Sequence, residues 1–366
     1  MSTQPDLLYS EDEEALRSAV RDLLTDHCGA AAVLARVESD EPHDRALWKN
    51  LAESMGLAGL LVPEERGGQG ASHREAAVVL EELGRAVAPV PYLTSAVIAT
   101  EALLACDGDE ADAVLSALAS GRTVGALTVP LSSAPGGEFT DVRATGGALT
   151  GRVTGVADAA FADVFLVPTS GGLFAVDASA GGVTVEPQIS FDPTRPLATV
   201  TFEAAAGRLL ADTAAPAVRR ALRAGAGLLA SEQLGAAEWL LTETVRYTRE
   251  RHQFNRPVGS FQALKHRLAQ LWLEVVNARA TARNAADALA TGSDDTDVAV
   301  AVAQAYTAPV AVHVAEEALQ LHGGIGMTWE HPIHLYLKRA KSSAIALGTA
   351  GSHREELAEL VDLRAP

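Results

Sequence analysis

The residue pattern changes twice along this chain of 366 residues, and the order of the changes restricts the folds it can adopt. Apolar residues first recur with helical spacing, then short β-rich runs separated by glycine, proline and aspartate follow, and helical periodicity finally returns. We therefore predict an α+β fold. Its expected parts are an N-terminal helical domain at 1–121, a middle antiparallel β-sandwich or barrel at 122–211 and a C-terminal helical bundle at 212–366.

Local signals position several of these elements. Ser10 with Glu13 and Ser72 with Glu75 have the spacing of a capping box, and Gly56 lies where a helix would end. The expected strands lie in Thr123–Val129, Val164–Val167, Gly182–Val185 and Ala198–Phe202. The last helical pattern is interrupted near 251–261, 290–296 and 323–332, which predicts long helices joined by short loops.

Composition excludes some classes of function. The formal net charge of -18 argues against a surface for nucleic acid or anionic membrane, because phosphate binding needs clustered Lys and Arg. Cys28 and Cys106 are too isolated for a disulfide framework or metal knuckle, so we interpret both as packing residues. The N-terminus lacks a basic start followed by an apolar run, and we find no stretch suited to span a bilayer. We expect a cytoplasmic protein.

Four motifs carry the functional information, and their order and spacing are more specific than any one of them. They are Leu61–Gly70, Arg246–Gln262, Gln320–Gly326 and Pro332–Thr349. Together they resemble the acyl-CoA dehydrogenases. The resemblance implies a helical N-terminal domain, a middle antiparallel β domain, a C-terminal four-helix bundle, FAD as cofactor and an acyl-CoA thioester as substrate.

The second motif contains side chains suited to a dinucleotide. Arg251 offers a charged planar fork to a pyrophosphate, Phe254 can pack on an aromatic ring, and Gln262 can donate and accept through its amide. From the residues alone, the role of closing a helix is favoured for Arg251, because basic side chains complement the C-terminal end of the helix dipole. The family resemblance favours the dinucleotide.

The third motif is rich in glycine. Gly323 and Gly324 allow a backbone to approach a ligand closely, and Gln320 supplies an amide, although a plain turn between helices would explain the glycines as well. In the resembled family these two motifs reach the flavin dinucleotide held mainly by a neighbouring subunit. We name the set Arg251, Phe254, Gln262, Gln320, Gly323 and Gly324 the clamp residues.

The fourth motif lacks the expected base. Oxidation of an acyl thioester needs a carboxylate to remove the α-proton while the β-hydrogen leaves as hydride to the flavin. Leu347 stands where many family members place that carboxylate, and Gly225 stands at the position that some relatives use instead. We therefore predict no catalytic residue in this chain.

The middle domain also departs from the family pattern. The segment Leu127–Pro130 keeps a threonine and a proline but lacks the acidic residue, and the following Leu131–Glu138 is shortened. No Trp occurs within Leu149–Asp158, where family members often place one to shield the flavin. These differences predict that the chain's own flavin cradle is degraded.

Other polar residues give weaker signals. We interpret Glu232 and Glu238 as structural, and Glu355 and Glu356 as a solvated helix face. The closest histidines near the glycine loop are His322, His331 and His334, but no pair has the helical spacing of a hydrolytic zinc site. We predict no metal site.

Three hypotheses remain. We favour a subunit without a base in a heterotetrameric (α2β2) acyl-CoA dehydrogenase, similar to those of actinobacterial steroid side-chain degradation. A second dehydrogenase-like subunit would carry the catalytic Glu and share FAD with the clamp residues, and electron transfer flavoprotein is the acceptor that the resemblance implies. The alternatives are a homomeric flavoenzyme with a relocated base or different oxidation chemistry, and a flavin-free structural or regulatory protein.

Overall fold

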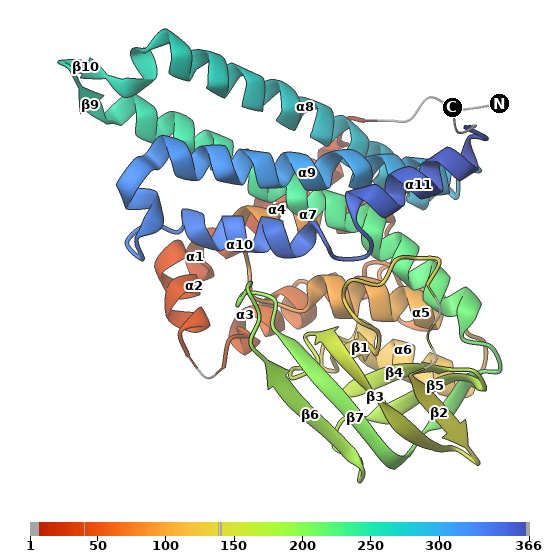
Figure 1. Cartoon of the computed structure of the whole chain (residues 1–366). Helices are drawn as coiled ribbons and strands as arrows, with labels where there is room; N and C mark the ends of the chain where they lie inside the picture. Colours follow the sequence, from red (N-terminus) through yellow and green to blue (C-terminus); the bar gives the residue numbers. More distant parts are fainter. Residues whose placement is uncertain (1–6, 40, 138, 140, 364–366) are drawn as a thin grey trace.

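A β domain packs beside two helical regions in the computed structural model, which describes residues 7–39, 41–137, 139 and 141–363 (Figure 1). This arrangement confirms the predicted α+β fold. The expectation about the N-terminal start rests largely on residues 1–6, which lie outside the described residues, as does Glu138 at the end of the shortened loop.

The N-terminal region is helical throughout. Its α-helices are α1 (Glu11–His27), α2 (Ala30–Val37), α3 (Arg45–Lys49), α4 (His73–Ala86), α5 (Thr100–Leu104) and α6 (Asp109–Ala119). Shorter turns are η1 (Asn50–Ser54), η2 (Leu57–Gly59), η3 (Glu64–Arg66) and η4 (Tyr92–Ala99). Both predicted capping boxes are present, because Ser10 caps α1 with Glu13 and Ser72 caps α4 with Glu75. Gly56 adopts φ 70° just after η1, so the predicted helix stop is confirmed.

The β domain contains two four-stranded sheets with the orders β1-β4-β5-β8 and β2-β3-β7-β6. The strands are β1 (Gly125–Leu127), β2 (Val142–Thr145), β3 (Ala148–Ala157), β4 (Val164–Thr169), β5 (Gly172–Asp177), β6 (Val183–Gln188), β7 (Leu197–Ala206) and β8 (Arg208–Ala211). Each predicted run contains a strand. The expectation of purely antiparallel pairing is wrong for β1 and β4, which are parallel. The chain visits β2 and β3 of the other sheet between them, so no hairpin fixes their relative direction.

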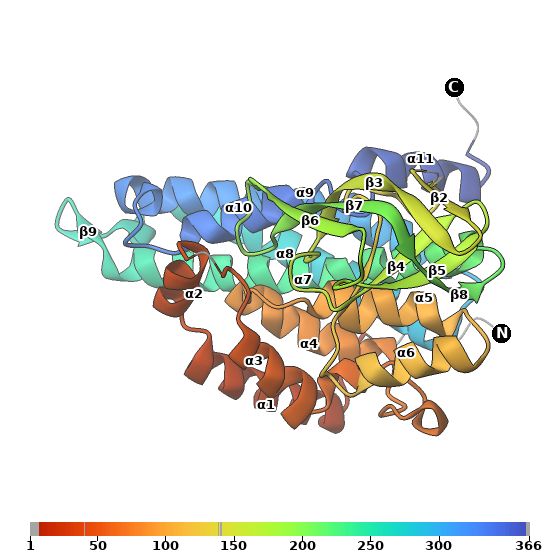
Figure 2. The same ribbon diagram turned by 90° about the horizontal axis from the view of Figure 1, so that it is seen from below.

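The C-terminal region is built on three long helices, α7 (Ala215–Glu250), α8 (Gln262–Thr291) and α9 (Thr296–His322). The hairpin of β9 (His252–Gln253) and β10 (Arg256–Pro257), followed by η5 (Val258–Ser260), joins α7 to α8. Beyond α9 lie η6 (Gly323–Met327), α10 (Ile333–Ser343) and α11 (Ala350–Leu360). Seen from below, the sheets lie in front of the bundle with α4, α5 and α6 along one side (Figure 2).

Helix α7 is the central helix, because it packs against α4 as well as α8 and α9. Glycines allow the close approach of α4 and α7. A Cβ at Gly84 would overlap the carbonyl oxygen of Glu232, and a Cβ at Gly235 would overlap that of Glu81. The two backbones therefore touch at a crossing where no larger residue fits.

A buried ion cluster joins the β domain to this bundle. Arg339 of α10 donates to Asp192 at 2.7 Å and to Glu232 at 2.8 Å, and Arg195 donates to Glu232 at 2.5 Å. Burial acts to raise the pKa of Glu232, but the two guanidinium groups outweigh it and lower that pKa. Glu232 is therefore a structural carboxylate, as predicted.

The sequence-based expectation about membrane spans needs one correction. Among the described residues, the segment Thr296–Met327 is long and apolar enough to cross a membrane by length and composition. However, 61% of its most apolar window is buried inside the protein, where α9 packs against α7, α8, α10 and α11. Its apolar character is that of a core helix.

Candidate functional site

The predicted base position lies in the turn between α10 and α11. Leu347 is 1% exposed and has a positive φ of 55°. Its N–H donates to the carbonyl oxygen of Leu131 at 2.7 Å, and its own carbonyl oxygen accepts from Nε2 of His353 at 2.9 Å. The position is thus fixed between the β domain and the last helix, and its side chain points into the interior.

The alternative base position faces the same point. A Cβ placed on Gly225 of α7 would lie 2.8 Å from Cγ1 of Ile98 and 3.2 Å from Cδ1 of Leu347. The two positions that sequence comparison singled out therefore converge in space. In this chain a leucine and a glycine occupy them, so neither supplies a carboxylate.

The space around these two positions is almost filled. A cavity of about 20 Å³ remains there, lined by Thr94, Ile98, Leu127, Val129, Pro130, Leu131, Ala157, Leu222 and Leu347. One water molecule needs about 10–15 Å³, whereas ligand pockets usually measure about 300–1,000 Å³. Thr128, the threonine retained from the family pattern, has a hydroxyl that the protein itself buries without a partner among the described residues. This region cannot hold a thioester as it is folded.

The first group of clamp residues follows the C-terminus of α7. Arg251 leaves the helix in an extended conformation, and its guanidinium is exposed with no ion pair within the described part of the chain. Phe254 and Asn255 have φ of 51° and 59°, as in the loop of a type I′ hairpin. Phe254 is 87% exposed. The hairpin thus presents a cation and an aromatic ring to solvent.

The start of α8 anchors this hairpin. The ring of Phe254 lies edge-on to Phe261, with centroids 6.1 Å apart, and the guanidinium of Arg256 lies 3.8 Å above the same Phe261 ring. Gln262, the next clamp residue, begins α8 and is exposed. The hairpin therefore packs on the residue that precedes α8.

The remaining clamp residues follow the C-terminus of α9. Gln320 is exposed in its last turn, and Gly323 ends the helix with φ 61°. A Cβ on Gly323 or Gly324 would meet no atom within 4 Å, so the backbone faces open space. The Tyr247 hydroxyl donates to the His322 carbonyl at 3.3 Å, which ties the end of α7 to the end of α9. The structure brings both motifs to one end of the bundle (Figure 1).

The histidines near this loop separate into two sets. His322 and His331 lie together with ring centroids 4.7 Å apart, whereas His334 packs against Trp329 at 4.6 Å. Glu243 of α7 joins the first set, and sequence reasoning missed it. The only local signal is that Glu243 precedes Tyr247 by one helical turn, and the Tyr247 ring stacks on His322 at 4.3 Å.

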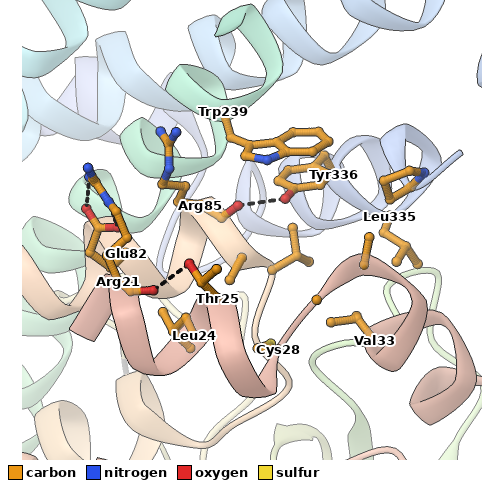
Figure 3. A pocket seen from close by; sticks show the side chains of 15 residues that line it. Arg21, Leu24, Thr25, Cys28, Val33, Glu82, Arg85, Trp239, Leu335 and Tyr336 are labelled. Carbon is orange, nitrogen blue, oxygen red and sulfur yellow. Dashed lines mark hydrogen bonds and ion pairs between the residues drawn. The ribbon is translucent and has the colours of Figure 1, made fainter. Parts of the chain in front are cut away.

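A separate cavity of about 220 Å³ lies between α1, α2, α4, α7 and α10 (Figure 3). Trp239 stacks on Tyr336 at 4.0 Å, and the Tyr336 hydroxyl donates to the carbonyl oxygen of Arg85 at 2.6 Å. Cys28 lies below them, and burial raises the pKa of its thiol to about 12. Cys28 is a buried packing residue, as predicted, and this cavity contains none of the clamp residues.

Comparison with known proteins settles the family. Residues 10–122 match the N-terminal domain and residues 215–361 the C-terminal domain of acyl-CoA dehydrogenases. The chain belongs to the acyl-CoA dehydrogenase family. It is 39% identical over 340 residues to acyl-CoA dehydrogenase IpdE2 of Mycobacterium tuberculosis, covering 91% of this chain and 92% of that protein. It is 38% identical over 357 residues to IpdE2 of Mycolicibacterium smegmatis, covering 96% and 98%.

Solved structures of heteromeric relatives are also similar. The Tcur3481-Tcur3483 steroid ACAD superposes with a TM-score of 0.85 at 30% identity, covering 96% of this acyl-CoA dehydrogenase and 98% of that chain. The ChsE4-ChsE5 complex from Mycobacterium tuberculosis superposes with a TM-score of 0.87 at 28% identity, covering 99% and 100%.

Acyl-CoA dehydrogenases bind FAD, and the two regions of this family member differ in how they fit it. The exposed charge, ring, amides and open glycine backbone at the end of the bundle suit the dinucleotide part. The filled space around Leu347 does not suit an acyl thioester beside a flavin ring. One end of the cofactor has suitable partners here, and the reacting end does not.

Proposed function

We propose that this chain is the subunit without a base in an FAD-dependent, heterotetrameric (α2β2) acyl-CoA dehydrogenase of the cytoplasm. In this proposal a second dehydrogenase-like subunit binds the flavin ring and the thioester and supplies the catalytic Glu. This chain contributes the clamp residues and part of the tetramer core. The substrate is the CoA thioester of a fatty or steroid side chain, and electron transfer flavoprotein is the acceptor.

One observation carries the proposal: both base positions lack a carboxylate and lie against a cavity of only about 20 Å³. If only the carboxylate were missing, another residue of this chain could serve as the base. A missing base in a filled site means that this chain cannot align an α-carbon with any group of its own. The clamp end, in contrast, is open to a ligand.

The clamp residues have a binding role in this scheme. Arg251 gives charge-assisted hydrogen bonds to a pyrophosphate, Phe254 covers a ring face, and the amides of Gln262 and Gln320 orient polar groups. Bound FAD supplies the hydride acceptor when the partner's carboxylate removes the α-proton. This chain moves no proton in that reaction.

Exposed apolar side chains beside the clamp support docking of another subunit at this end. Met327 is 73% exposed and Trp329 is 57% exposed, both in the loop after α9. Trp272, on α8 ten residues after Gln262, is 60% exposed. Large exposed apolar side chains are typical of a protein interface. The heteromeric ChsE4-ChsE5 relative supports a partner of the same fold.

The test is expression of this chain alone and together with a candidate partner subunit that carries the catalytic Glu. We expect substoichiometric flavin and no acyl-CoA oxidation from the lone chain, and full flavin with turnover from the complex. Arg251→Ala should reduce flavin retention in the complex, whereas Arg249→Ala, an exposed arginine one half-turn earlier, should not.

The other outcomes separate the alternatives. Full flavin content and turnover in the lone chain would establish a homomeric enzyme and overturn the proposal. Normal flavin retention and turnover in the Arg251→Ala complex would show that the clamp is not used, as expected for a purely structural subunit.

A further inference from the structure

The cluster of Glu243, His322 and His331 has the composition of a metal site. These side chains come from α7, from the end of α9 and from the loop before α10. The atoms with which they could bind a metal all lie within 4.8 Å of one another. Imidazole nitrogen and carboxylate oxygen are ligands that zinc and neighbouring divalent transition metals accept.

The hydrogen bonding of His322 leaves one nitrogen free. Its Nδ1 lies 2.8 Å from the carbonyl oxygen of Ala318, and because a carbonyl only accepts, Nδ1 must carry the proton. The lone pair therefore resides on Nε2. His322 is 3% exposed, and this Nε2 has no hydrogen-bond partner among the described residues. A ligand histidine that donates its other N–H to a carbonyl is the usual arrangement in metal sites.

The separations are close to those of a bound ion. Two ligand atoms about 2.1 Å from one tetrahedral ion lie about 3.4 Å apart. Nε2 of His331 lies 3.5 Å from Oε1 of Glu243, which is already that separation and too long for a good hydrogen bond. The remaining pairs lie within 4.8 Å and need to close by up to about 1.4 Å, which rotations of the Glu243 and His331 side chains, 15% and 13% exposed, can supply.

Two existing contacts compete with an ion. Arg246 donates to both carboxylate oxygens of Glu243, at 2.9 and 2.5 Å, but the Arg246 side chain is 56% exposed, so this is a surface pair. The backbone N–H of Ile333 donates to Nδ1 of His331 at 3.4 Å. An ion on Nε2 requires the tautomer with its proton on Nδ1, so binding the ion gives up this weak bond. Neither contact uses the free nitrogen of His322.

We propose that Glu243, His322 and His331 bind a divalent transition-metal ion of the zinc type, with water completing the coordination. The ion would link α7, α9 and the loop before α10, and so fix the glycine-rich loop beside Gln320. This site goes beyond the proposed flavin role. It needs neither flavin nor a partner chain to form.

The test is titration of the full-length, metal-stripped chain with Zn²⁺ against a chromophoric chelator, and with Co²⁺ followed by its visible absorption. We expect about one ion per chain and a higher thermal unfolding midpoint with Zn²⁺. Glu243→Gln and His331→Ala should each bind at least about tenfold more weakly. The control is His313→Ala. His313 lies on α9, as His322 does, and its ring pairs with Glu274 at 2.7 Å. This variant should bind Zn²⁺ like wild type.

Absence of stoichiometric binding to the wild-type chain would overturn the proposal. So would unchanged affinity in both cluster variants, because the ion would then lie elsewhere. Circular dichroism of each variant separates lost ligands from lost structure, and Glu243→Gln, at a half-buried surface, keeps the test valid if His331→Ala does not fold. Because the titration measures metal binding and needs neither flavin nor a partner chain, its result does not depend on the proposed function.

Discussion

Replacing Leu347 by glutamate restores the residue type of the missing base and tests whether the base is all that is missing. The new carboxyl would lie opposite Gly225, among apolar side chains and a cavity of about 20 Å³. Among the described residues, the only hydroxyl lining that cavity belongs to Thr94, which already donates to Asp158 at 2.7 Å. We expect Leu347→Glu to give no acyl-CoA oxidation in the lone chain, because no thioester fits beside the carboxyl.

The cost in stability follows from the same surroundings. Leu347 is 1% exposed, so its replacement forfeits about 1.5–3 kcal/mol of leucine burial. A buried carboxyl without a partner adds about 1–3 kcal/mol. Together these give about 2.5–6 kcal/mol. Burial raises the carboxyl's pKa in the folded state, so the variant loses further stability as pH rises above the unfolded value of about 4.3.

Urea unfolding across pH, together with oxidation assays using an artificial electron acceptor, measures both effects. Leu347→Gln is the matched control for Leu347→Glu, since glutamine has the shape of glutamate and carries no charge. It should share the loss at low pH and lack the further loss as pH rises, while Leu347→Met should cost less than about 1.5 kcal/mol. Turnover by Leu347→Glu alone, or stability equal to wild type at neutral pH, would refute the argument that this site is filled.

Three further predictions concern the fold and the clamp. Gly235→Ala should lower the free energy of unfolding by about 1–3 kcal/mol or more, because its Cβ would overlap the α4 backbone, whereas Gly181→Ala, with no atom within 4 Å, should not. The pKa values of Asp158 and Glu232 are lowered in the folded protein despite burial. The stability that these carboxylates give the fold should therefore be complete above their unfolded pKa values of about 4. It should be lost as pH falls through their folded pKa values. Urea unfolding should show a shallower acid loss in Asp158→Asn. Phe254→Asn should stabilise the lone chain slightly and reduce flavin retention in the complex.

Features governed by neighbours in sequence could be predicted. The capping boxes at Ser10 and Ser72 involve residues three apart, and the strand runs follow from β-branched residues between turn formers. The choice of Leu347 and Gly225 as base positions came from family resemblance rather than from spacing, and the structure shows that the two positions face each other.

Features governed by residues far apart in the sequence could not be predicted. The parallel pairing of β1 with β4 depends on a crossover between sheets. Glu243 lies far in sequence from His322 and His331, and only the packing of α7 against α9 brings them together. The segment Thr296–Met327 was not expected to be apolar enough to span a bilayer, but it is by composition, and only its burial within the bundle identifies it as a core helix.

The hairpin tip presents an energetic problem that the isolated chain does not solve. Phe254 adopts φ 51° and is 87% exposed, although positive φ is unfavourable for a bulky side chain by about 1–2 kcal/mol and such loops favour Asn and Gly. Its edge contact with Phe261 buries little of the ring. A bulky side chain that is both strained and exposed gains little from the fold of this chain, so we predict a compensating contact from outside it. A flavin dinucleotide from a partner subunit would supply it, which is why Phe254→Asn should affect the lone chain and the complex in opposite directions.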